Sequence, residues 1–259
     1  MTALEELFNT PGKKLIGYMP AGYPTIEGAK AIIKAMVEGG VDAVEVGFPY
    51  SDPVMDGPTI QAAAEQSLAN GTKASDVLET LDFASKLAPA VVMSYWNPIE
   101  RYGVERFAED LAKAAGSGTI TPDLTVEESD SWLVACKDKK VNSIYVVAPS
   151  SNDDRLQKVL SKCSGFVYAA SLMGVTGARA EVSNAAESLV ARIRKYTTLP
   201  VCVGLGVSTP EQAKDVARYA DGVIVGSAFI NAIQNAPNFD AGLVAVKELA
   251  GKLKAGVAA

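Results

Sequence analysis

Residues 15–47, LIGYMPAGYPTIEGAKAIIKAMVEGGVDAVEVG, contain two short apolar runs separated by a longer segment. The runs Leu15–Met19 and Ala43–Gly47 have the length and composition of buried strands. Between them, Ile26–Glu38 repeats apolar residues at helical spacing. The order of strand, helix and strand is typical of the βα units that build a parallel sheet.

The same alternation continues to the end of the chain and predicts eight βα units. Further strands are expected at Val91–Tyr95, Thr119–Thr121, Ser143–Val147, Phe166–Ala170, Val201–Gly204 and Gly222–Val225. Further helices are expected at Lys73–Leu87, Val104–Ala115, Glu127–Lys139, Asp153–Ser161, Asn184–Lys195, Pro210–Arg218 and Phe239–Lys252.

Eight such units in 259 residues favour an α/β fold of the closed (β/α)8 barrel type. We expect one domain over residues 1–259, with an extra N-terminal helix and a short helix after the eighth strand. An open doubly wound sheet would give the same local pattern and is the alternative. Two loops after strands are long, 48–58 and 171–183, and such loops carry the chemistry of barrels.

The composition excludes several classes of protein. The net charge is −6 and no cluster of Lys and Arg occurs, so nucleic acid and anionic membrane surfaces are not expected partners. No apolar stretch is long enough for a transmembrane helix and no signal peptide is recognised, so a cytoplasmic protein is expected. The cysteines Cys136, Cys163 and Cys202 are too far apart to suggest a disulfide framework or a metal site.

The absence of histidine restricts the possible chemistry. It removes the commonest general base, the commonest transition-metal ligand and every Ser-His or Cys-His nucleophile pair. Proton transfer near neutral pH must therefore use carboxylates, Tyr, Lys or Cys.

Carboxylates cluster around the second predicted strand. Glu45 lies inside an apolar strand, where burial should raise its pKa into a range useful for proton transfer. Asp52 and Asp56 follow on a loop that contains several prolines, so at least one could be held facing Glu45. A buried glutamate satisfied by its neighbours, and aspartates that cap turns, are the structural alternatives.

Three glycine-rich turns occur late in the chain, at 173–177, 204–208 and 225–228. Two of them follow the seventh and eighth strands, where barrels commonly bind phosphate through backbone N–H groups and the N-terminus of a short helix. Ser227 begins such a segment. A single Gly-x-Gly is more often a tight turn, but the three together favour a phosphate site.

Tyr18, Tyr95 and Tyr168 all lie at or near the ends of predicted strands. There they could line a flat apolar pocket and offer a polar hydroxyl, although packing in the core is an equally good interpretation. Cys202 lies within a strand and is interpreted as a small packing residue.

The run from Glu45 to Gln61, EVGFPYSDPVMDGPTIQ, resembles the signature of tryptophan synthase alpha chains. Four further motifs of that family follow in order: Tyr95-Trp96-Asn97-Pro98, Pro122-Asp123-Leu124, Gly174-Val175-Thr176-Gly177 and Gly226-Ser227-Ala228. The resemblance therefore covers essentially the whole chain, and it implies cleavage of indole-3-glycerol phosphate to indole and glyceraldehyde 3-phosphate.

The resemblance also implies roles for individual residues. Glu45 would be the main acid and base, and Asp56 would bind the indole N–H. The phosphate would be bound by Gly177, Gly206, Gly226 and Ser227. The residues expected to border the substrate are Tyr18, Met93, Tyr95, Ile120, Tyr168, Thr176 and Leu205, with Tyr168 beside Glu45.

No cofactor or metal is expected in this chain. The resemblance implies a beta subunit that carries pyridoxal phosphate and an α2β2 assembly, with Asp52, Pro53, Asn97, Pro98 and Asp123 at the interface. The chain departs from the usual family pattern at Tyr18 and Leu205, where Phe is usual, at Pro20, where Thr is usual, and at Thr125, where Pro is usual. These departures affect the shape of the pocket and the loop around Asp123.

Two other functions are compatible with the fold alone. One is a different phosphate-binding barrel enzyme, such as an isomerase or an aldolase that uses a lysine Schiff base, but no predicted strand contains a lysine. The other is a non-catalytic subunit that only holds a ligand. The pair Glu45 and Asp56 argues against it, because a pure binder gains nothing from burying an unpaired carboxylate.

Overall fold

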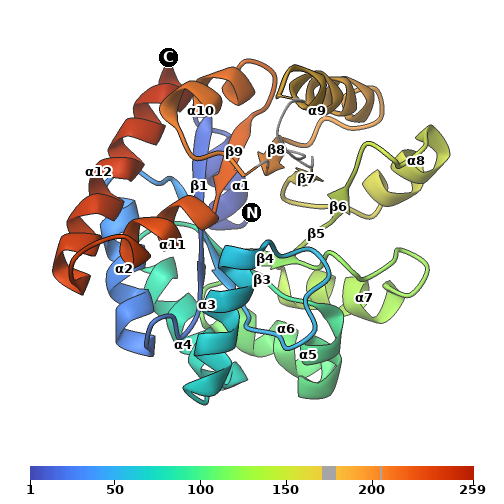
Figure 1. The fold of residues 1–259 in the computed structure, drawn as a ribbon. Helices are drawn as coiled ribbons and strands as arrows, with labels where there is room; N and C mark the ends of the chain where they lie inside the picture. The colour runs from blue at the N-terminus through green and yellow to red at the C-terminus, as the bar shows by residue number, and fades with distance from the viewer. Residues whose placement is uncertain (171–178, 205) are drawn as a thin grey trace.

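A computed structural model describes residues 1–170, 179–204 and 206–259, and in it nine parallel strands form a nearly closed barrel surrounded by helices (Figure 1). The strands are β1 (Lys14–Pro20), β2 (Ala43–Gly47), β3 (Ala90–Met93), β4 (Gly118–Ile120), β5 (Asn142–Ile144), β6 (Val146–Val147), β7 (Val167–Ala170), β8 (Val201–Gly204) and β9 (Gly222–Val225). Their order is β5-β4-β3-β2-β1-β9-β8-β7-β6, so β1 lies between β2 and β9. The predicted (β/α)8 barrel is confirmed.

The fifth predicted strand, 143–147, is divided into β5 and β6 by a single residue, Tyr145. β5 pairs with β4, whereas β6 pairs with β7, so the two halves join the two ends of the sheet. The carbonyl of Tyr145 still accepts a hydrogen bond from Tyr168 N–H at 3.1 Å. Nine strands therefore form the wall of an eight-unit barrel.

Twelve helices occur in the described part of the chain. They are α1 (Ala3–Phe8), α2 (Ile26–Glu38), α3 (Pro58–Ala69), α4 (Ala74–Ser85), α5 (Trp96–Tyr102), α6 (Val104–Lys113), α7 (Asp130–Lys139), α8 (Asp153–Leu160), α9 (Arg179–Ile193), α10 (Pro210–Ala217), α11 (Ser227–Gln234) and α12 (Phe239–Ala258). The extra N-terminal helix and the short helix after the last strand are thus confirmed as α1 and α11. None of these helices is long and apolar enough to cross a membrane.

Several boundaries differ from the predictions. Helices α3 and α5 were not predicted, because α3 is rich in alanine and has no clear apolar stripe, and α5 is only seven residues long. Helix α9 begins at Arg179, inside the expected loop 171–183. Strand β1 begins at Lys14, so one strand does contain a lysine.

Lys14 is buried, and its ammonium group donates hydrogen bonds to the carbonyls of Thr10 and Pro11 and to the Thr10 hydroxyl. These partners precede β1, so Lys14 belongs to the end of the barrel opposite the carboxyl ends of the strands. Helix α1 lies at that same end, where Leu4 is fully buried and Phe8 packs on Phe166 with ring centroids 5.9 Å apart. Chemistry at the other end does not involve this lysine.

Two apolar layers hold the barrel together. Inside the barrel, alternate residues of the strands pack on one another, among them Ile16, Ala43, Val91, Ile120 and Ile224. The remaining strand residues face outward and pack against the ring of helices. Because strand side chains alternate between the two layers, Tyr18, Glu45 and Gly47 all face the interior.

Candidate active site

A cavity of about 1020 Å³ opens at the carboxyl ends of the strands. Its wall includes eight of the residues predicted for the site: Tyr18, Glu45, Asp56, Met93, Tyr168, Gly206, Gly226 and Ser227. The structure therefore brings together residues from β1, β2, β3 and β7, from the loops after β2 and β8, and from the N-terminus of α11.

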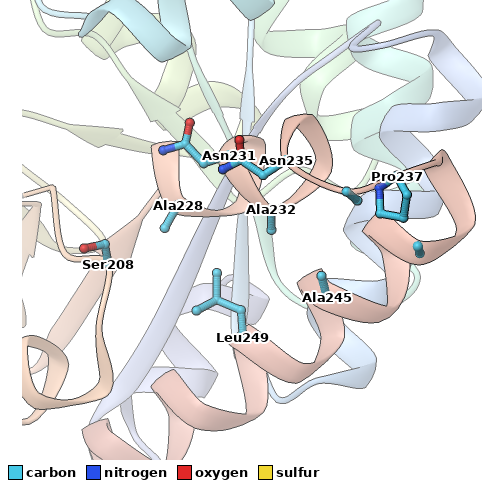
Figure 2. Close-up of a pocket in the computed structure, with 10 residues that line it drawn as sticks. Ser208, Ala228, Asn231, Ala232, Asn235, Pro237, Ala245 and Leu249 are labelled. Atoms are coloured by element: carbon cyan, nitrogen blue, oxygen red, sulfur yellow. The ribbon is translucent and has the colours of Figure 1, made fainter.

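A second hollow, of about 510 Å³, lies between α11 and α12 (Figure 2). Alanines and Leu249 form most of its wall, and its polar groups are Ser208, Asn231 and Asn235. It contains no ionisable side chain. The cavity at the barrel mouth is therefore the candidate for chemistry.

Glu45 on β2 is only 2% exposed, and its Oε2 has no hydrogen-bond partner among the described residues. Burial, together with the nearby charge of Asp56, raises the pKa of Glu45 to about 8. The side chain is therefore mostly protonated at pH 7, and it can give up its proton and take one back close to neutral pH. The expected raised pKa of this strand glutamate is confirmed in direction.

Asp56 lies half-buried in the loop between β2 and α3. Its backbone carbonyl accepts a hydrogen bond from the Gln61 side chain at 2.7 Å, which ties the loop to the first turns of α3. Burial raises the pKa of Asp56, and a hydrogen bond from the Tyr95 hydroxyl opposes that rise. Asp56 is thus in a more polar setting than Glu45, as predicted.

Two tyrosines, one on the neighbouring strand β1 and one on β7, lie near Glu45. Tyr18 on β1 is paired in register with Glu45, and its ring packs where a side chain at Gly47 would be. Tyr168 on β7 packs in the same way against Gly204 on β8. Burial and the charges of Glu45 and Asp56 raise the pKa of both hydroxyls, so both remain neutral hydrogen-bond donors.

The N-terminus of α11, which is the positive end of its helix dipole, lies at the cavity. Gly226 caps this helix without a side-chain hydrogen bond, which leaves first-turn N–H groups of Ser227 and Ala228 available to an anion. Gly206 adopts the left-handed conformation with φ +65°, and a side chain there would meet open space. Both glycines and Ser227 line the cavity.

Some predicted site residues have other positions. Ile120, the last residue of β4, is fully buried among the residues of the barrel interior and is not part of the cavity wall. Tyr95 is 2% exposed and is not part of the cavity wall; its hydroxyl instead contacts the loop that carries Asp56. Thr176, Gly177 and Leu205 lie outside the described residues.

The predicted interface residues lie on the rim of the same mouth. Asp52 and Asn97 are exposed, and Pro53 and Pro98 are half-buried. The Asp123 carboxylate accepts two contacts from Trp96 N–H, at 2.8 and 3.1 Å, and so links the loops after β3 and β4. Val54 and Met55 beside them are 76% and 43% exposed.

Part of the cavity was not anticipated from the sequence. The loop 148–151 after β6 and Ile60 on α3 contribute to the wall, and Gln61 fixes the backbone of Asp56. Loop 148–151, Ala-Pro-Ser-Ser, follows a strand end, and this position alone would have indicated it. Gln61 carries no such signal, because its role depends on α3.

Within the described residues, no group of Cys, Asp and Glu side chains is arranged to hold a metal ion. The three cysteines are unpaired, and burial raises the pKa of each thiol. Cys202 belongs to the apolar barrel interior, as its interpretation as a packing residue predicted.

A (β/α)8 barrel with two carboxyl groups and a helix N-terminus at its mouth is typical of the barrel enzymes that act on phosphorylated substrates. The comparisons with known proteins give the family. The model of the tryptophan synthase alpha chain family matches residues 4–258, and the chain belongs to that family.

Individual relatives agree over nearly the whole chain. The tryptophan synthase alpha chain of Streptomyces avermitilis is 54% identical over 245 residues, which are 94% of this chain and 88% of the relative. That of Nocardia farcinica is 55% identical over 244 residues, 94% of this chain and 90% of the relative. A solved structure of Mycobacterium tuberculosis tryptophan synthase has a TM-score of 0.91 and 46% identity, covering 100% of this chain and 99% of that one.

Proposed function

We propose that this chain cleaves indole-3-glycerol phosphate to indole and glyceraldehyde 3-phosphate, a carbon–carbon lyase reaction of the retro-aldol type. The observation that carries the proposal is the pair Glu45 and Asp56, which lines one cavity in two different environments. Membership of the family supports the same reaction.

The first step needs a proton on C3 of the indole ring. Glu45 supplies it, because its pKa of about 8 keeps it protonated at neutral pH. The ring then carries a positive charge that is shared with the ring nitrogen. Asp56, with its carboxylate on the more polar loop, stabilises this charge and accepts a hydrogen bond from the N–H.

The second step breaks the carbon–carbon bond. The Glu45 carboxylate takes the proton from the glycerol hydroxyl on the carbon attached to C3, and an aldehyde forms there. The electron pair of the broken bond returns to the indole ring, which becomes neutral. Glu45 is protonated again at the end, so one carboxyl group performs both proton transfers. These two reaction steps need no cofactor in this chain.

The phosphate of the substrate binds at the N-terminus of α11. Backbone N–H groups of Gly226, Ser227 and the turn around Gly206 would donate to it, and the helix dipole favours its charge. The indole ring then lies toward Glu45, between the rings of Tyr18 and Tyr168. Gly177, Thr176 and Leu205 complete this site in the proposal.

A beta subunit that carries pyridoxal phosphate is the proposed partner, in an α2β2 assembly. The surface at the barrel mouth supports a protein partner, because the exposed apolar side chains of Val54 and Met55 adjoin Asp52 and Pro53 on the loop that carries Asp56. A partner that covers this loop would exclude water from the cavity and hold Asp56 in place.

The direct test is to incubate the purified chain with indole-3-glycerol phosphate and to measure indole, with and without a cognate beta subunit. We expect slow release alone and faster release in the complex. A subunit that only holds ligand would bind the substrate and release no indole under either condition, and this result would contradict the proposal.

A further inference from the structure

The hydroxyl of Tyr95 lies under the loop that carries Asp56 and contacts three consecutive residues of it. It accepts hydrogen bonds from the N–H groups of Val54, at 3.1 Å, and Met55, at 2.9 Å. The same hydroxyl lies near the carboxylate of Asp56, and a hydrogen bond from it lowers the pKa of Asp56 against the effect of burial. The Tyr95 ring is itself fixed, because it is 2% exposed and packs on Tyr50, with ring centroids 5.3 Å apart.

These three contacts use the full capacity of a phenol. Its oxygen has two lone pairs and one proton. Because both lone pairs are occupied by N–H groups of the loop, the proton is directed toward Asp56. The Tyr95 hydroxyl oxygen therefore sets both the backbone position of residues 54 and 55 and the direction of the proton donated to Asp56.

Among the described residues, few other contacts of this loop could hold Asp56. Val54 and Met55 are largely exposed and contribute little burial. On the other side, Gln61 holds only the backbone carbonyl of Asp56. Within the part of the chain that the structure describes, the side-chain partner of the carboxylate itself is Tyr95.

We infer that Tyr95 is a positioning residue for Asp56. Its hydroxyl fixes the backbone of residues 54 and 55 and keeps the Asp56 carboxylate oriented toward the cavity. The inference rests on the proposed function, in which Asp56 stabilises the charged indole. Tyr95 is not part of the cavity wall, so in this inference it acts through Asp56.

The variant Tyr95→Phe keeps the ring and removes the hydroxyl, and Tyr50→Phe is the matched control. Tyr50 stacks on the same ring, but none of the three hydrogen bonds uses its hydroxyl. Two measurements need no substrate. They are amide hydrogen exchange at Val54 and Met55, and a 13C NMR titration of the Asp56 carboxyl, assigned with Asp56→Asn.

In Tyr95→Phe we expect faster exchange at both amides. The hydrogen bond from Tyr95 favours the ionised carboxylate, so its loss should raise the titration midpoint of Asp56. Glu45, Tyr18 and Tyr168 also act on this site, but they are unchanged in both variants. A second variant, 3-fluorotyrosine at position 95, makes the phenol a stronger donor and should lower the midpoint instead.

In the lyase reaction, Tyr95→Phe should lower kcat by roughly tenfold or more, with a smaller change in KM, because the interaction acts on the transition state. Its activity should also decline at a higher pH than that of the wild type as the solution is made acidic. Unchanged amide exchange and an unchanged Asp56 midpoint in folded Tyr95→Phe would overturn the inference, whether or not the chain cleaves indole-3-glycerol phosphate.

Discussion

Asp56, on the loop that follows β2, lies close enough to Glu45 on β2 for its charge to add to the effect of burial on the pKa of Glu45. The two carboxyl groups share one cavity but not one environment. Among the described residues, Glu45 has an oxygen without a hydrogen-bond partner, whereas Asp56 has the Tyr95 hydroxyl. In the proposed reaction, this difference assigns the proton transfers to Glu45 and the stabilisation of positive charge to Asp56.

Glu45 should destabilise the fold as the pH rises. Its pKa is about 8 in the folded chain and close to 4.5 when unfolded, so between these values the folded state holds a proton that the unfolded state has lost. This group's contribution to stability then falls with rising pH, by at most about 1.4 kcal/mol per pH unit. Glu45→Gln lacks this pH-dependent contribution to stability, because glutamine does not titrate.

Urea unfolding of wild type and Glu45→Gln between pH 5 and 8 would therefore show the variant gaining stability relative to wild type as the pH increases. A difference that stays constant across this range would mean that Glu45 titrates normally in the folded chain.

Gly204→Ala should displace Tyr168. A Cβ at position 204 would collide with the hydroxyl and ring of that tyrosine, so the ring must move away from Glu45. We expect kcat to fall by at least about tenfold, since a shift of about 1 Å near the reacting atoms can cost more than that. Gly251→Ala, where a Cβ meets only ordinary contacts, should leave activity unchanged. Equal kcat in the two variants would refute this role of Tyr168.

Ser227→Asp should weaken binding of phosphorylated ligands. The new carboxylate would lie at the N-terminus of α11, beside the proposed phosphate position, and would repel a dianion. Calorimetry with glyceraldehyde 3-phosphate should show at least about a tenfold loss of affinity, while Ser227→Ala, which keeps the backbone donors, should show little change. Comparable affinity in all three proteins would place the phosphate elsewhere.

The loop that carries Asp56 should also be part of the subunit interface. Asp52 is exposed on it, next to the apolar side chains Val54 and Met55. Asp52→Lys should weaken association with a cognate beta subunit and reduce the activation that this subunit gives, while indole release by the isolated chain stays the same. Association as tight as that of wild type, measured by sedimentation, would count against an interface at this mouth.

Much of the fold could be predicted from the sequence because its strands are short apolar runs with clear limits. Strands β2, β8 and β9 and helix α2 have the same bounds in the prediction and in the structure. Helix α3 was missed because its apolar residues are mainly alanines, which give no amphipathic stripe. The break at Tyr145 could not be predicted, because it depends on how the two ends of the sheet meet.

The candidate site could be predicted only in part, because some of its contacts join residues that are far apart in the sequence. Glu45 could be predicted because it is a charged residue between apolar residues of one strand, and this local context indicates that its side chain is buried. Tyr95 lies at or near the end of a predicted strand, as Tyr18 and Tyr168 do, yet its hydroxyl contacts the backbone of Val54 and Met55 and is not part of the cavity wall. This arrangement depends on a contact between residues about forty positions apart, which no local pattern contains.

The most direct test of the account is the turnover of Glu45→Gln with indole-3-glycerol phosphate, measured as indole released by protein shown to be folded. Glutamine keeps the shape of the side chain but can neither give nor take the proton. The account predicts a loss of at least roughly 10²-fold in kcat, with substrate binding largely retained. Turnover near that of wild type would show that another group transfers the protons and would contradict the mechanism.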